Sequence, residues 1–202
     1  YRVGDLSLVY PLARGSGPML ATTAAILIFG ERPTVLAVCG ALLIGVGVFV
    51  LAGDPRKLRQ SGAGPAVAYA LATGVAIASY TLWDKHGVGE LHTPPVVYNW
   101  ITTTAMVVIM LPNALRHRDA LREHWMLHRR QALIVAIFSP LSYILILTAL
   151  AFSPVSYIAP AREISILIGA LLGARVLAEG QTQRRMLAAI IMVAGIVALA
   201  VG

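Results

Sequence analysis

Two stretches decide how this chain is organised: YPLARGSGPML at residues 10–20 and YIAPAREISIL at residues 157–167. Each places an arginine shortly after a proline and inside a long apolar run, Arg14 in the first stretch and Arg162 in the second. A charged side chain at the centre of a membrane-spanning helix costs about 2.5–3.5 kcal/mol, so it normally faces a cavity or a partner. The two arginines are therefore the first candidates for a functional role.

The composition is typical of a membrane protein. Of the 202 residues, 58% are hydrophobic and 12% are charged, whereas soluble domains are about half apolar and about a quarter charged. The net charge of +7 would also suit nucleic acid. The basic residues lie between apolar runs, however, so we interpret them as a topology signal and expect no nucleic-acid partner. The single cysteine, Cys39, cannot form a disulfide framework or a zinc site alone.

Apolar runs long enough to cross a bilayer occur seven times in the chain. A hydrocarbon core of about 30 Å requires about 20 apolar residues in a helix. The predicted spans cover residues 6–30, 34–52, 64–83, 95–112, 131–152, 154–177 and 185–201. The chain begins with Tyr1 rather than Met and reaches its first apolar span within a few residues, so we expect a fragment or a processed piece of a longer protein. It shows no cleavable signal peptide.

The longest predicted loop, residues 113–130, is strongly basic. Its Leu121 and Trp125 lie one helical turn apart, which would suit a short interfacial helix. All five histidines are predicted to lie in loops, where we expect solvated side chains and no metal site: His86, His92, His117, His124 and His128.

Basic residues are divided unequally between the two sides of the predicted bundle. The loops that follow spans 34–52, 95–112 and 154–177 hold most of them, whereas the opposite side holds only Arg32 and Lys85. The positive-inside rule places the basic side in the cytoplasm and the C-terminus outside. We therefore expect a multi-pass protein of the cell membrane, such as a bacterial inner membrane.

The chain also contains an internal repeat with a spacing of 148 residues. This spacing matches Arg14 with Arg162, Glu31 with Glu179, and Gly47 with Gly195. Three predicted spans separate the two copies, so the repeating unit has five helices, and an odd number inverts neighbouring units relative to each other. Inverted repeats are an architecture of secondary transporters, with the substrate site near the middle of the membrane.

The repeat predicts the fold class and the domain division. We expect an all-α, polytopic membrane helix bundle built from inverted five-helix repeats. Residues 1–53 would form the last two helices of the first repeat, residues 54–63 a basic linker, and residues 64–202 the whole second repeat. The first three helices of ten would then be missing before Tyr1.

These features resemble the EamA-domain proteins of the drug/metabolite transporter superfamily. The matching motifs run through the whole chain: Pro11 and Pro160, Gly30-Glu31-Arg32 and Ala178-Glu179-Gly180, Ser153-Pro154-Val155-Ser156, and glycines of the last helix of each repeat, Gly40, Gly45, Gly47 and Gly195. The resemblance implies ten helices in two inverted repeats, of which this chain shows seven. It also implies that both termini are cytoplasmic, whereas the charge count places the C-terminus outside.

Six residues are the candidates for substrate binding: Arg14, Arg162, Tyr10, Tyr80, Tyr143 and Glu163. A guanidinium can hold a carboxylate or a phosphate through two parallel hydrogen bonds. The alternative is structural, with each arginine bound to carbonyls that Pro11 or Pro160 leaves free, or to a buried acid. Glu163 would either titrate as a proton-coupling group or form a permanent ion pair with Arg14 or with a helix that the chain lacks.

Glu31 and Glu179 lie at the ends of predicted spans. We expect them to form helix-end hydrogen bonds or salt bridges with Arg32 or Arg184. The GxxxG pattern at residues 169–173 predicts close helix packing within the bundle.

The sequence contains no nucleotide-binding loop, no HExxH or CxxC motif and no catalytic cluster at membrane depth. We therefore expect no enzyme, no cofactor and no metal. The favoured function is a secondary transporter that moves a small metabolite, such as an amino acid or another carboxylate, by alternating access. The alternatives are a non-transporting membrane scaffold or regulatory subunit, and a channel. The expected partners are a small solute and the lipid bilayer, and the sequence leaves a homodimer open.

Overall fold

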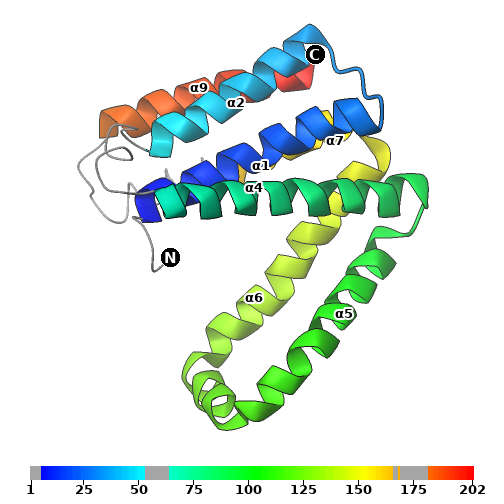
Figure 1. Cartoon of the computed structure of the whole chain (residues 1–202), viewed down its shortest axis with the longest axis vertical. Helices are drawn as coiled ribbons and strands as arrows, with labels where there is room; N and C mark the ends of the chain where they lie inside the picture. Colours follow the sequence, from blue (N-terminus) through cyan, green and yellow to red (C-terminus); the bar gives the residue numbers. More distant parts are fainter. Residues whose placement is uncertain (1–5, 53–63, 166–167, 169–181) are drawn as a thin grey trace. The chain divides into compact units, whose positions relative to one another are not determined.

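The computed structural model describes residues 6–52, 64–165, 168 and 182–202, with the backbone alone at 6–14, 51–52, 64, 66 and 182–185. The described chain is helical and contains no strand (Figure 1). Its helices are α1 (Leu6–Ile28), α2 (Val35–Ala52), α4 (Gly64–Lys85), the π-helix η1 (His86–Glu90), α5 (Pro95–Arg116), α6 (Arg118–Phe152), α7 (Val155–Ala161) and α9 (Thr182–Val201). The all-α fold class predicted from the hydropathy pattern is therefore confirmed.

The predicted loop at residues 113–130 is wrong. Helix α5 continues past Pro112 to Arg116, and α6 begins at Arg118, so the segment is almost entirely helical. Pro112 does not end the helix because a helical proline removes only one hydrogen bond, which the surrounding turns tolerate in an apolar segment. The predicted short helix around Leu121 and Trp125 is confirmed, and it is separated from the rest of α6 by a kink at His128, where φ is −123° and ψ is 19°.

The prediction that all five histidines lie in loops is wrong for His86, His124 and His128, which lie in helices. His86 begins η1, and His124 and His128 lie within α6. His117 joins α5 to α6, and His92 lies in the loop before α5 with a positive φ of 53°. The sequence reading placed the histidines in loops because polar residues interrupt the apolar pattern, but a polar helical turn interrupts it equally.

The predicted span at residues 154–177 is also not one continuous helix. Helix α7 ends at Ala161, and Arg162 and Glu163 form a turn before helical backbone resumes at Ile164. The GxxxG pattern at residues 169–173 and Glu179 lie outside the described residues.

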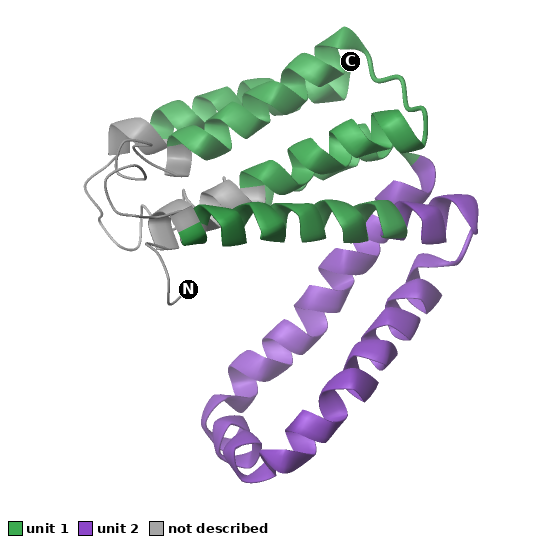
Figure 2. Ribbon diagram, viewed as in Figure 1, with its two compact units in different colours: residues 1–83, 153–202 green, residues 84–152 purple. Residues whose placement is uncertain are grey.

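The described chain divides into two compact units (Figure 2). Unit 1 comprises Tyr1–Trp83 and Ser153–Gly202, and unit 2 comprises Asp84–Phe152. These units cut across the predicted five-helix repeats, so the repeat and domain boundaries stay predictions.

Close packing of α2 against α9 forms the core of unit 1, where the two helices lie side by side (Figure 1). Glycines make this approach possible, because a Cβ atom added at Gly40 would lie 2.6 Å from the carbonyl oxygen of Gly195. Ile44, Val48 and Met192 are almost fully buried around this contact. Small residues that allow backbones to approach are the usual basis of helix association in lipid.

Unit 2 is built around an α5–α6 hairpin, which packs against η1 (Figure 2). Both helices of the hairpin are long and apolar enough to cross a membrane. Most of their large apolar side chains are exposed, and Ile109 and Phe138, for example, are 69% and 62% exposed. Such exposure suits a lipid environment, in which apolar side chains need no protein partner.

Candidate functional site

The break after α7 positions the candidate residue Arg162. Pro160 has no N–H group and so cannot complete the helical ladder around it. The backbone tightens instead, with the N–H of Glu163 donating to the carbonyl of Pro160 at 3.0 Å and that of Ser165 to Arg162 at 3.3 Å. Discontinuous helices of this kind line substrate sites in transporters, because they release backbone polar groups inside a membrane.

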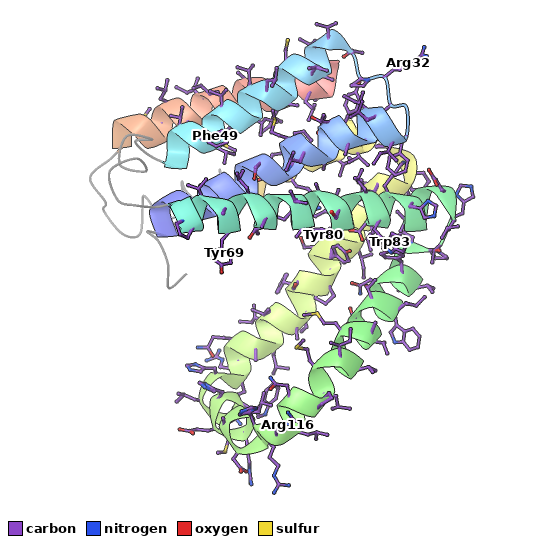
Figure 3. All side chains as sticks on the ribbon, viewed as in Figure 1. Arg32, Phe49, Tyr69, Tyr80, Trp83 and Arg116 are labelled. Carbon is purple, nitrogen blue, oxygen red and sulfur yellow. The ribbon has the colours of Figure 1, made fainter. Side chains whose placement is uncertain are left out.

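The guanidinium of Arg162 contacts the last turns of α4, within unit 1. Its Nη2 donates to the hydroxyl of Tyr80 at 3.2 Å, and its Nη1 approaches Oγ1 of Thr81 at 3.4 Å. The Cζ atom also lies 5.7 Å from the centroid of the Tyr80 ring, within the range of a cation–π interaction. Figure 3 shows Tyr80 on α4. The structure thus brings together two of the predicted site residues, Arg162 and Tyr80.

The partners of Arg162 are neutral, and this determines what the group can do chemically. Among the described residues, no carboxylate lies within 4.0 Å of its guanidinium nitrogens. A guanidinium has five N–H donors in a fixed plane, and the two contacts above engage only part of that plane. The half-buried cation can therefore still bind a carboxylate or phosphate through parallel hydrogen bonds.

Glu163, the next candidate, is buried with 5% of its surface exposed. Its position in the turn after α7 separates it from the regular helix on which the sequence placed it. Tyr10 and Arg14 belong to α1, where the structure describes the backbone of these residues but not their side chains. Their part in a common site with Arg162 stays a prediction.

Tyr143 belongs to a different polar cluster, in unit 2. Its hydroxyl donates to Oδ2 of Asp84 at 2.8 Å, and the hydroxyl of Tyr98 donates to Oδ1 of the same carboxylate at 3.1 Å. Asp84 is only 3% exposed. Sequence reasoning did not single out Asp84, which directly follows the predicted span at residues 64–83, and so missed this cluster. The sequence did contain one indication of the cluster, because an acidic residue ends one apolar helix and the next two apolar helices each carry a tyrosine.

Glu31 connects the α1–α2 loop to the start of α7. Its two carboxylate oxygens accept hydrogen bonds from the backbone N–H groups of Val155 at 2.7 Å and Ser156 at 2.9 Å. The predicted helix-end hydrogen bonding is confirmed, although the helix is α7, more than 120 residues later in the chain. A carboxylate at this end satisfies N–H groups that have no partner within the helix.

The fold and this site define a multi-pass α-helical membrane protein with a charged group at a helix break. A family model described as the EamA-like transporter family matches residues 64–201. This match covers more than half of the chain, and the protein belongs to the EamA-like transporter family. No curated protein and no solved structure matches the chain.

Proposed function

We propose that the protein is a secondary transporter of a small anionic or zwitterionic metabolite, such as an amino acid or another carboxylate. The observation that carries the proposal is the guanidinium of Arg162, held by the neutral groups of Tyr80 and Thr81 beside a helix break. Membership of a transporter family supports the general class. The charge of Arg162 supports the choice of solute, because a cationic solute would require an acid in its place.

The proposed mechanism is alternating access between inverted five-helix repeats, in the membrane of a bacterial cell. Arg162 would bind the carboxylate of the solute, and Tyr80 would orient the guanidinium through its ring and its hydroxyl. Arg14 would supply the equivalent group from the first repeat, as the spacing of 148 residues predicts. An ion or proton gradient, or exchange of one solute for another, would drive net movement.

The test is solute flux into proteoliposomes that contain the intact protein. Labelled amino acids and small carboxylates are supplied with and without a pH gradient, and initial rates are measured against concentration. We expect saturable flux that falls about tenfold in Arg162→Lys, which corresponds to about 1.4 kcal/mol. Lysine keeps the charge but loses the planar pair of donors.

The matched control is Arg32→Lys, because Arg32 is exposed in the α1–α2 loop and should leave flux unchanged (Figure 3). The proposed role of the arginines is wrong if Arg162→Ala and Arg14→Ala both transport at the wild-type rate at equal expression. Flux of cationic solutes alone would contradict the proposed charge of the solute.

A further inference from the structure

Asp84 is a buried carboxylate that the proposed solute site does not use. It lies one residue before the end of α4 and is held by phenol groups from two other helices, Tyr98 of α5 and Tyr143 of α6. Both carboxylate oxygens accept a hydrogen bond, at 3.1 Å and 2.8 Å. An ionisable residue placed among membrane-spanning helices is expensive to maintain, and this cost suggests a function.

The local backbone is shaped to form this cluster. Directly after α4 the helix widens into η1, a form that occurs frequently at functional sites. Gly87 of this turn is buried, and a Cβ atom there would lie 2.2 Å from Cε2 of Tyr98. The glycine therefore allows the Tyr98 ring to lie against the turn, where its hydroxyl reaches Asp84.

Tyrosine partners allow the carboxyl group to exist in both protonation states. A phenol can donate one hydrogen bond and also accept one. When Asp84 is ionised, Tyr98 and Tyr143 both donate to it, as the structure shows. When a solvent proton forms an O–H bond on Oδ2, that group can donate to the Tyr143 oxygen while Tyr98 still donates to Oδ1. An arginine partner has no acceptor and could not reverse its role in this way.

The surroundings of Asp84 have opposite effects on the ionisation of its carboxyl group. Burial disfavours the ionised carboxylate, whereas the hydrogen bonds from the two phenols favour it. The Nζ atom of Lys85 donates to the carbonyl of Leu150 on α6 at 2.9 Å. On η1, the side chains of His86 and Glu90 contact each other through Nδ1 and Oε2, and both are about half exposed. The elements packed here, α5 and α6, present Tyr98 and Tyr143 to the carboxylate.

We propose that Asp84 is a proton-binding site, in which Tyr98 and Tyr143 exchange donor and acceptor roles as the proton enters and leaves. Its use in driving solute movement rests on the proposed transport function. Proton binding itself does not, because it can be measured with no solute present.

The experiment is an infrared titration of the intact protein in lipid nanodiscs between acidic and alkaline pH. We expect the carboxylic C=O absorption that develops as the pH falls in the wild type to contain a component that is lost in Asp84→Asn, while the contribution of the other buried carboxyl, Glu163, remains. Asp119→Asn is the matched control, because Asp119 is exposed at the start of α6 and its loss should leave the buried-carboxyl band unchanged. Identical titrations of the wild type and a folded Asp84→Asn protein would overturn the proposal.

Two further variants test the role of the phenols and do not depend on the folding of Asp84→Asn. Tyr98→Phe and Tyr143→Phe each remove one donor to the ionised form, so each should raise the midpoint of the band by about 0.7 pH unit. If neither variant moves the midpoint, the exchange of roles is wrong. If the band titrates but Arg162→Ala leaves flux unchanged, the proton site stands while the proposed solute site fails.

Discussion

The two units of the molecule use apolar residues in different ways. In unit 1, α2 and α9 approach closely through Gly40 and Gly195, and the side chains around them are buried. In unit 2, the α5–α6 hairpin is also long and apolar enough to cross a membrane, yet most of its large side chains are exposed. The difference shows that, in lipid, hydrophobicity does not decide what is packed. Small residues allow packing, and polar groups create specific contacts where packing is sparse.

Unit 2 shows how polar groups create specific contacts where packing is sparse. Among its described residues, the buried ones gather around η1 and Asp84, where Tyr98, Leu147 and Leu150 are each less than 10% exposed. The hairpin is thus held at the end that carries the hydrogen-bonded carboxylate. The following predictions test this comparison, in order of decreasing effect.

The largest effect is expected from Gly40→Leu. The new side chain would overlap backbone atoms of α9, which cannot rotate away as a flexible side chain can. We expect a loss of stability of about 3 kcal/mol or a failure to fold, seen as loss of the monodisperse peak in size-exclusion chromatography. Ala105→Leu on the exposed face of α5 is the control and should behave as the wild type. If both variants keep the same monodisperse peak, close helix packing does not distinguish unit 1 from unit 2.

A matched pair of isoleucines measures packing directly. Ile44 in α2 is 1% exposed and Ile109 in α5 is 69% exposed. Ile44→Ala should lower the free energy of unfolding by about 2 kcal/mol, because packing contacts are lost. Ile109→Ala should change it by less than about 0.5 kcal/mol. Unfolding in mixed micelles with increasing denaturing detergent gives both values, and a larger loss for Ile109→Ala would reverse our assignment of the lipid-facing surface.

Glu31→Gln tests the polar contact that anchors α7 in unit 1. Glutamine keeps one acceptor oxygen but loses the charge and the second oxygen, so only part of the contact with Val155 and Ser156 survives. We expect a loss of about 1.5 kcal/mol in the same unfolding measurement. Arg32→Gln changes the neighbouring exposed residue and should have no effect. If both variants are neutral, Glu31 does not stabilise the start of α7.

Tyr143→Phe tests the corresponding polar contact of unit 2. The change removes the 2.8 Å hydrogen bond to Asp84 and leaves the ring in place. We expect a loss of about 1 kcal/mol, typical of one hydrogen bond. Tyr69→Phe, at an exposed position of α4, is the control. An unchanged stability of Tyr143→Phe would mean that the phenol contact does not hold the hairpin.

The candidate site was only partly predictable. Arg162 and Glu163 could be identified because charges are rare in apolar spans, and Pro160 marked the irregular backbone around them. The orientation of Arg162 toward Tyr80 could not be identified, because 82 residues separate the two in the chain. Asp84 was missed for the same reason, since its phenol partners are 14 and 59 residues away.

The sequence by itself determined the helical class, most of the helix bounds and the family resemblance, because the length and spacing of apolar runs are local properties that a bilayer constrains strongly. The tertiary structure decided which helices are packed and which are exposed, since helices of both kinds carry long apolar runs. It also decided which of the polar residues meet. Contacts such as Glu31 with α7, Arg162 with Tyr80, and Asp84 with Tyr143 depend on helices that are distant in sequence.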